Sequence, residues 1–199
     1  MLTTLLLFSV AFLIGSIPTG YIAGRLFSGT DIRLHGSGNT GATNAFRVLG
    51  KKIGMLVFAV DFFKGFLPAF LVSRFFSLNY SDPKELGLWI GVGAILGHVF
   101  TPFLGFKGGK GIATGAGVLC GAFPILCLMV IGVWGIVFFF TRIVSISSLI
   151  ALIALVIFSF FLGLKLSISL LFLGVCLFTI WTHRSNISRL RKGEERKVN

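Results

Sequence analysis

Charged residues are scarce in this sequence, and acidic residues are the rarest of them. Charged residues make up 12% of the 199 residues, and only 6 are aspartate or glutamate. Hydrophobic residues make up 55%, with 23 phenylalanines among them. A soluble domain carries about 25% charged residues, and the mean hydropathy of +0.98 lies well above the balance of such a domain. The composition therefore excludes a soluble globular domain and predicts an integral membrane protein.

Cysteine and histidine are also rare, with three of each. Cys120, Cys127 and Cys176 lie inside apolar runs and match no metal-ligand spacing, so we expect small core or lipid-facing residues. Paired carboxylates at ligand spacing are absent outside the tail, and the sequence has no Gly-x-Ser-x-Gly elbow. We therefore expect neither a metal nor a cofactor, and a Ser-His-Asp hydrolase has little support.

Basic residues outnumber acidic ones and give a net charge of +12. In a soluble protein this excess would indicate nucleic acid, but most of these residues flank apolar runs, where the positive-inside rule explains them. No soluble face is long enough to bind nucleic acid, so none is expected as a partner. The basic residues gather in three places that should be cytoplasmic. These places hold Arg25, Arg33, Arg47, Lys51 and Lys52; Lys107 and Lys110; and the basic residues after His183.

Long apolar runs predict the membrane spans. The runs cover residues 2 to 24, 53 to 76, 86 to 104, 112 to 141, 143 to 162 and 166 to 182. A path from Lys110 to a cytoplasmic tail needs an even number of crossings, so one of the last three runs must be two spans. Pro124 divides the run 112 to 141 into a short segment, 112 to 122, and a longer one. The sequence predicts an all-α polytopic membrane protein with seven transmembrane helices, its N-terminus outside and its C-terminus cytoplasmic.

The short segment is the unusual member of this set. Its roughly 11 residues cannot cross about 30 Å of hydrocarbon at about 1.5 Å per residue, so it must be buried among other helices or extended by the preceding glycine-rich stretch. The first run lacks a basic region and a cleavage site, and we expect it to remain as a span. With no repeat or linker, residues 1–199 should form a single membrane domain, of which 183–199 are a basic cytoplasmic tail.

The first polar loop contains the stretch HGSGNTGATN, with the spacing Gly36-x-Gly38-x-x-Gly41. This spacing is found in dinucleotide-binding proteins, and Asp61 lies 20 residues after Gly41, where a ribose-binding acid is expected. That fingerprint requires a preceding strand in a βαβ unit, whereas here a membrane span precedes it and Asp61 lies in an apolar run. The context therefore argues against a nucleotide site.

The same loop offers chemistry for an anion. Its glycines allow backbone N–H groups to approach a phosphate, and a helix beginning near Thr43 would add its dipole, with Arg47 supplying a bidentate charge. A flexible polar membrane loop is the alternative. The side-chain donors are Ser37, Asn39, Thr40, Thr43 and Asn44.

The second loop, residues 105 to 111, also combines glycines with groups that can bind an anion, in fewer residues. It reads Gly-Phe-Lys-Gly-Gly-Lys-Gly and is not a P-loop, because that motif would need glycine at 110 and lysine at 111. Lys107 and Lys110 among four glycines still predict a compact phosphate cradle at the start of the short segment. An interfacial turn with positive-inside lysines is the alternative.

Ionisable and polar residues elsewhere suggest further contacts. Asp61 and Lys64 lie three residues apart inside the second span and can pair, either for function or for structure alone. His98 is expected to be a hydrogen-bonded core residue. If the tail is helical, His183, Asn186 and Leu190 share one face, although a solvated basic tail near anionic lipids is the alternative.

Three motifs stand in order along this chain. They are Ser37-Gly-Asn39-x-Gly41-x-Thr43-Asn44-x-x-Arg47, then Lys107-Gly-Gly-Lys110-Gly, then His183-x-x-Asn186-Ile-x-Arg189-Leu followed by Gly193-Glu194-Glu195. Together they resemble the bacterial acyl-phosphate:glycerol-3-phosphate acyltransferases, the PlsY family. The likeness extends over essentially the whole chain, including Gly15 to Tyr21 and Asp61-Phe-Phe-Lys64-Gly65. Either Glu194 or Glu195 could be the glutamate of the family's third motif.

The resemblance implies a seven-span enzyme of phospholipid synthesis in the bacterial cytoplasmic (inner) membrane, with its active site facing the cytoplasm. It would move an acyl chain from acyl phosphate, not from acyl-CoA or acyl carrier protein, to the 1-hydroxyl of glycerol 3-phosphate. The products would be lysophosphatidic acid and phosphate. The partners implied are acyl phosphate, glycerol 3-phosphate and membrane lipid, and a single copy of the chain is compatible with the reaction.

The resemblance also implies roles for residues. Ser37 and Arg47 belong to the family's essential first motif, the 105 to 111 loop binds glycerol 3-phosphate, and the tail glutamate is structural. The expected catalytic residues are Ser37, Asn39, Lys107, His183 and Asn186. The expected substrate-binding residues are Gly36, Gly38, Thr40, Thr43, Asn44, Arg47, Gly108, Gly109 and Lys110.

We expect the two loops to hold both substrates, with His183 and Asn186 orienting the acceptor hydroxyl. Its proton could pass to His183 or to a phosphate oxygen of the donor. A transporter or channel for an organic anion is the alternative function, but the basic loops all lie on one predicted side. The His-x-x-x-x-Asp motif of other glycerolipid acyltransferases is absent, because Thr40, Phe103 and Ser188 occupy the fifth position after the three histidines.

Overall fold

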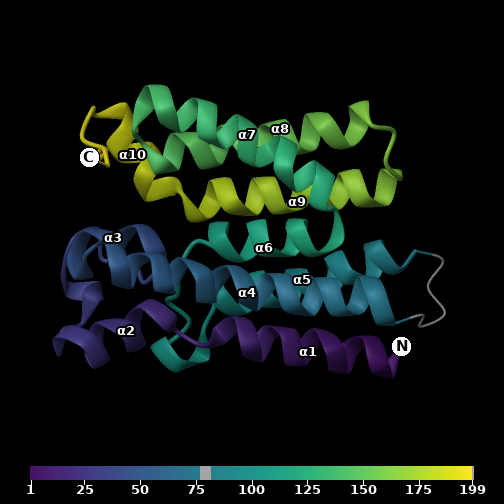
Figure 1. Cartoon of the computed structure of the whole chain (residues 1–199), viewed down its shortest axis with the longest axis horizontal. Coiled ribbons are helices and arrows are strands. Elements are labelled where there is room, and N and C mark those ends of the chain that lie inside the picture. The colour runs from purple at the N-terminus through teal and green to yellow at the C-terminus, as the bar shows by residue number, and fades with distance from the viewer. Residues whose placement is uncertain (77–81, 199) are drawn as a thin grey trace. The chain divides into compact units, whose positions relative to one another are not determined.

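The computed structural model describes residues 1–76 and 82–198, and throughout this part of the chain the regular structure is helical, without strands. The all-α prediction is therefore confirmed. The helices divide into two compact units, Met1–Phe123 and Pro124–Asn199, which are described in turn (Figure 1).

The first unit contains α1 to α6. Its members are α1 (Leu2–Ser16), α2 (Thr19–Ser28), the 3-10 helix η1 (Ile32–Leu34), α3 (Ala42–Leu49), α4 (Lys51–Phe75), α5 (Pro83–Val99), the 3-10 helix η2 (Pro102–Leu104) and α6 (Ile112–Ala122). Within this unit α1, α4, α5 and α6 run alongside one another, and α2 and α3 lie at the end where α4 begins (Figure 1).

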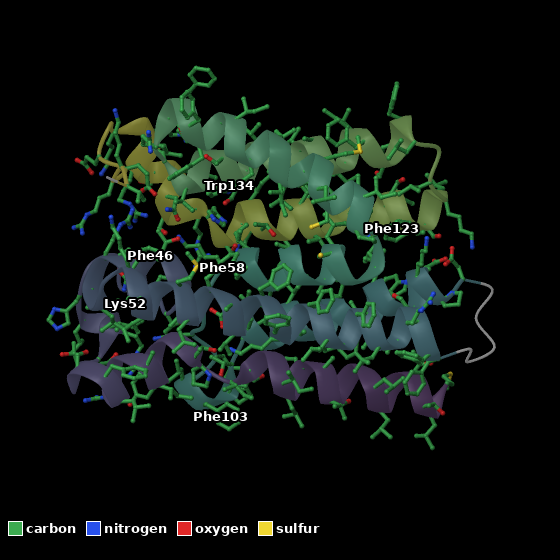
Figure 2. All side chains as sticks on the ribbon, in the orientation of Figure 1. Phe46, Lys52, Phe58, Phe103, Phe123 and Trp134 are labelled. Atoms are coloured by element: carbon green, nitrogen blue, oxygen red, sulfur yellow. The ribbon has the colours of Figure 1, made fainter. Side chains whose placement is uncertain are left out.

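Small residues let these helices approach backbone to backbone. A Cβ added at Gly97 of α5 would overlap the Phe12 carbonyl of α1, and one added at Gly117 of α6 would overlap the Phe62 carbonyl of α4. The ring of Phe46 in α3 likewise lies against Gly54 of α4 (Figure 2). Small residues have this role between membrane helices, where van der Waals packing replaces the hydrophobic effect.

The short helix α6 has the environment that its length requires. Its 11 residues coincide with the predicted segment 112 to 122, and one face is buried against α4 and α5. Val118 of α6 fills the space above Gly91 of α5. The expectation that this segment is buried among other helices is confirmed.

The first apolar run needs a correction, because it holds two helices. α1 ends at Ser16 and α2 begins at Thr19, with Ile17 and Pro18 between them. Proline has no backbone N–H and disfavours helical geometry at the residue before it, which explains the break. Leu2–Ser28 still satisfies the length and hydropathy expected of one membrane span.

The second unit contains α7 (Pro124–Thr141), α8 (Val144–Phe161), α9 (Leu166–Thr182) and α10 (Arg184–Arg191). Helix α7 begins at Pro124, which confirms the division of the longest apolar run. The indole N–H of Trp134 in α7 donates to Ser148 of α8 at 3.2 Å. The axes of α9 and α10 differ by 61°, so the tail helix turns away from the last apolar helix.

Several helices are long and apolar enough to cross a membrane. Within the described residues there are five such segments, or six if the bent pair α9 and α10 counts as one, and α6 is a shorter apolar helix. Large apolar side chains are exposed on these segments, among them Leu5, Phe63 and Phe139. This exposure is expected of helices that face lipid. The chain is therefore an integral membrane protein.

Candidate active site

Asn44 organises the first polar loop. This residue of α3 is 1% exposed. Its Oδ1 accepts the backbone N–H of Ser37 at 2.8 Å, and its Nδ2 donates to the carbonyls of Ile32 at 2.9 Å and His35 at 3.1 Å. The amide therefore fixes the loop backbone on both sides of Gly36.

Two glycines of the first loop have a left-handed backbone conformation. Gly36 and Gly38 have φ values of 64° and 72°, which L-residues with a side chain seldom adopt. The N–H of Gly38 donates to His35 and that of Gly41 donates to Asn39 Oδ1. We expected backbone N–H groups here to face a phosphate, and the N–H groups of Ser37, Gly38 and Gly41 instead donate within the protein. The tight turns of the loop and the Asn39 and Asn44 amides supply these partners, which explains the difference.

Other side chains of the first motif differ in exposure. Ser37 is exposed and Asn39 half-buried, whereas Thr40 is buried beneath the loop. Thr43 and Arg47 are half-buried and lie four residues apart on α3, which places them on one face of the helix. Helix α3 begins at Ala42, one residue before the predicted start. The motif thus presents Ser37 and Asn39 from the loop, and Thr43 and Arg47 from the helix.

The second loop folds back onto the end of α5. The N–H of Gly108 donates to the Val99 carbonyl at 2.9 Å, and the N–H of Gly109 donates to the His98 carbonyl at 3.0 Å. A Cβ at Gly108 would overlap that His98 carbonyl, and a Cβ at Gly109 would overlap the His98 ring at Nε2. The two glycines between the lysines are therefore required by close approach to α5.

The lysines remain at the surface of this fold. Lys107 is exposed, and Lys110 is half-buried next to Gly111, the residue that precedes α6. The two loops also meet, because the Asn39 amide lies 3.5 Å from the Gly108 carbonyl. The structure of the first unit thus brings the first two motifs together, although about 70 residues separate them in sequence.

A charged cluster beside the first loop was not predicted. Asp31 accepts bidentate hydrogen bonds from Arg33, and a second ion pair joins it to Arg25 at 3.6 Å. Both guanidinium groups lie over the ring of Tyr21. The Arg33 side chain holds the pKa of Asp31 down at about 2, well below its ordinary 3.8. Arg25 and Arg33 had been interpreted only as topology signals, since pairing across a loop leaves no periodic pattern in a sequence.

His183 has a defined tautomer. It lies between α9 and α10 and is buried, and its Nδ1 is 2.9 Å from the Thr179 carbonyl oxygen. A carbonyl only accepts hydrogen bonds, so Nδ1 carries the proton and the neutral ring has its lone pair on Nε2. The ring is therefore oriented by the last turn of α9.

Glu195 is the structural glutamate of the tail. Its carboxylate accepts hydrogen bonds from Asn186 at 2.5 Å, from Arg189 at 2.6 Å and from Ser145 of α8 at 2.9 Å. Burial alone would raise the pKa of Glu195, but these three donors outweigh it and lower the pKa below the ordinary 4.5. Glu194 is exposed. The structure therefore assigns the anchoring role to Glu195, and α10 shows that the first part of the tail is helical.

In the part of the chain that the structure describes, no group of three or more histidine, cysteine, aspartate or glutamate side chains could hold a metal ion. Asp61 and Lys64 pair inside the first unit at 2.8 Å, as the sequence suggested, and His98, whose part in this cluster was not predicted, lies 3.7 Å from the same Asp61 oxygen.

Comparison with known proteins agrees with the resemblance seen in the sequence. A family model described as glycerol-3-phosphate acyltransferase matches residues 5–193. Glycerol-3-phosphate acyltransferase of Chlorobaculum parvum is 45% identical, over 100% of this chain and 97% of its own. That of Fusobacterium nucleatum is 42% identical, over 94% of each chain.

Two solved structures have the same fold as this chain. They are crystal structures of PlsY (YgiH), an integral membrane glycerol 3-phosphate acyltransferase, in a glycerol 3-phosphate form and a lysophosphatidic acid form. Both are 38% identical and cover 99% of this chain and 96% of their own, with TM-scores of 0.91 and 0.88.

Proposed function

The chain belongs to the glycerol-3-phosphate acyltransferase family, and we propose that the donor in its acylation of glycerol 3-phosphate is an acyl phosphate. It is a bacterial integral membrane enzyme of phospholipid synthesis, and lysophosphatidic acid is its product. Membership of an enzyme family argues against the transporter alternative.

The choice of acyl phosphate as the donor rests on one observation. Two glycine-rich basic loops meet in the first unit, through Asn39 and Gly108, and each presents polar or charged side chains at its surface. Two phosphate-bearing substrates would occupy two such loops. An acyl phosphate is already activated, so the protein needs chiefly to position two anions and stabilise developing charge.

In the proposed reaction the 1-hydroxyl oxygen of glycerol 3-phosphate attacks the carbonyl carbon of the acyl phosphate. The bond from that carbon to the phosphate oxygen then breaks, and inorganic phosphate leaves with the electron pair. Ser37 and Asn39 hold the donor, and Arg47, Lys107 and Lys110 balance the negative charge. Gly108 and Gly109 shape the acceptor loop.

Asn44 acts through the shape of the first loop, together with Gly36, Gly38 and Thr40. Thr43 donates from the first turn of α3 to a substrate phosphate, where the positive end of the helix dipole favours negative charge. His183 and Asn186 orient the acceptor hydroxyl. The hydroxyl proton passes to His183 Nε2 or to the leaving phosphate, and the protonated Nδ1 of His183 supports the first route.

The proposed topology has seven spans, with the N-terminus outside and the loops and tail on the cytoplasmic side of the inner membrane. Within the first unit the beginnings of α4 and α6 and the end of α5 lie at one end, which supports a common side for both loops (Figure 1). We infer a single functional domain that works as one copy of the chain.

The test is an assay of the purified protein in detergent with acyl phosphate and glycerol 3-phosphate. We expect phosphate release that depends on the acceptor, and formation of lysophosphatidic acid. Parallel reactions with acyl-CoA and with acyl carrier protein as donors should give no product. Product from either of these donors, with none from acyl phosphate, would contradict the proposed donor.

A further inference from the structure

Three titratable side chains are buried together beneath the second loop. Asp61 and Lys64 of α4 and His98 of α5 are 1%, 4% and 8% exposed. Lys64 Nζ lies 2.8 Å from Asp61 Oδ1, and His98 Nδ1 lies 3.7 Å from the same oxygen. The proposed reaction uses none of these groups directly, although burying them is costly.

Lys64 ties this cluster to the break between α1 and α2. Besides Asp61, its ammonium donates to the Ile17 carbonyl and the Thr19 hydroxyl, the residues on either side of Pro18. Thr101, which precedes the second loop, donates to the Ser16 carbonyl at 2.5 Å. The break in the first span is thus connected to α4 and to the start of the second loop.

His98 connects the cluster to the second loop itself. Its carbonyl accepts the Gly109 N–H, and its ring at Nε2 occupies the place that a Gly109 side chain would need. Asp61 lies at the opposite nitrogen of the ring. The imidazole therefore stands between a fixed carboxylate and the backbone that separates Lys107 from Lys110.

Net stability alone does not explain such a cluster, because well-packed apolar residues often replace a buried ion pair at no cost. Ion pairs and hydrogen bonds are directional, so they hold the groups that they join in one defined arrangement. Here the groups joined are the α1–α2 break, the end of α5 and the lysine loop.

We propose that Asp61, Lys64 and His98 form a positioning network that sets the place of the Lys107–Lys110 loop for the phosphate of glycerol 3-phosphate. The inference rests on the proposed role of that loop. The three residues touch no substrate and act through the backbone at Gly109.

The test is a suppression experiment on the full-length enzyme. Gly109→Ala should raise the KM for glycerol 3-phosphate on the order of tenfold or more, because the new Cβ displaces the loop from the His98 ring. Adding His98→Ala removes the ring and should return the KM for glycerol 3-phosphate much of the way to its wild-type value. The KM for acyl phosphate should change little. Gly108→Ala is the matched control, since its Cβ meets backbone carbonyls that His98→Ala leaves in place.

A second variant works even if Gly109→Ala does not fold. Asp61→Asn with Lys64→Met removes both charges and nearly keeps the side-chain volumes. The network predicts a raised KM for glycerol 3-phosphate in folded protein, whereas a purely structural pair predicts altered thermal stability with an unchanged KM.

The outcomes separate the two proposals. A wild-type enzyme without acceptor-dependent phosphate release defeats the proposed donor. If the wild type is active, either of two results overturns the positioning network alone. One is that the losses from the His98 and Gly109 substitutions simply add. The other is that Asp61→Asn with Lys64→Met leaves the KM for glycerol 3-phosphate unchanged.

Discussion

At the scale of single residues, the first motif separates into side chains that shape the loop and side chains that face outward. Asn44 is buried, and its described bonds go to the loop backbone. Ser37 is exposed, and Arg47 is half-buried one turn beyond Thr43. A polar residue in a motif can thus serve the substrate directly or through the backbone, and in this loop the hydrogen-bond partners of Asn44 show that it acts through the backbone.

Ser37→Ala and Arg47→Ala should each lower kcat/KM on the order of a hundredfold, because each removes a donor to a phosphate or to developing charge. Thermal unfolding in detergent should change little for Ser37→Ala, whose side chain is exposed. His35→Ala, an exposed neighbour outside the site, is the control. Near-normal activity in both site variants would contradict the assignment of this loop.

His183→Ala distinguishes the two proton routes. If Nε2 accepts the proton, turnover at saturating substrates should fall by about a hundredfold or more. Near-normal turnover would instead direct the proton to the leaving phosphate. Phosphate release measured over a range of both substrate concentrations separates kcat from KM and so separates proton transfer from binding.

At the scale of elements, helix α10 is attached to α8 through the Glu195 carboxylate. This carboxylate accepts hydrogen bonds from Ser145, near the start of α8, and from Asn186 and Arg189 of α10. The backbone N–H of Val198 also donates to the Arg142 carbonyl at 2.8 Å. The residues after α10 therefore pack back onto the turn between α7 and α8.

This attachment should depend on pH. Because the folded pKa of Glu195 lies below the ordinary 4.5, its stabilisation is fully present above pH 4.5 and is lost as the pH falls through the lower, folded pKa. Glu195→Gln should lower thermal stability at neutral pH, and the difference from wild type should shrink in acid. Glu194→Gln is the matched control, and an equal effect of both substitutions would contradict the assignment of Glu195.

Packing between α4 and α6 should tolerate no added methyl group. Gly117→Ala places a Cβ against the Phe62 carbonyl, and we expect about 1–3 kcal/mol of destabilisation from overpacking. The control is Gly132→Ala in α7, where nothing lies within 4 Å of the new Cβ. That change should be neutral or stabilise the helix by about 0.5–1 kcal/mol. Equal unfolding temperatures in detergent for both variants would contradict this account of the packing.

At the scale of the whole molecule, the short helix α6 determines the predicted topology. If it crosses, the α7–α8 turn and the tail are cytoplasmic and the α8–α9 turn is outside. Alkaline phosphatase, active only outside, should therefore be active when fused at Gly163 and inactive when fused at Arg142. The reverse pattern would mean that α6 does not complete a crossing.

The sequence alone predicted much of this protein, because the relevant signals are local. Apolar runs placed the helices to within a few residues, Pro124 divided the longest run, and closely spaced motifs identified the family. Pro18 was a local signal as well, and its break between α1 and α2 was missed because the hydropathy of the run continues across it.

Only the tertiary structure decided which groups meet across long separations. Lys64 reaches Ile17, Glu195 reaches Ser145, and the His98 ring abuts Gly109. Each contact depends on how helices pack and on single side-chain rotamers, and the sequence of one helix does not show which residue of another its side chains will reach. For the same reason, only the structure could show that Asn44 serves the loop backbone, whereas composition predicted a membrane protein and the resemblance of its motifs to a known family implied an acyltransferase.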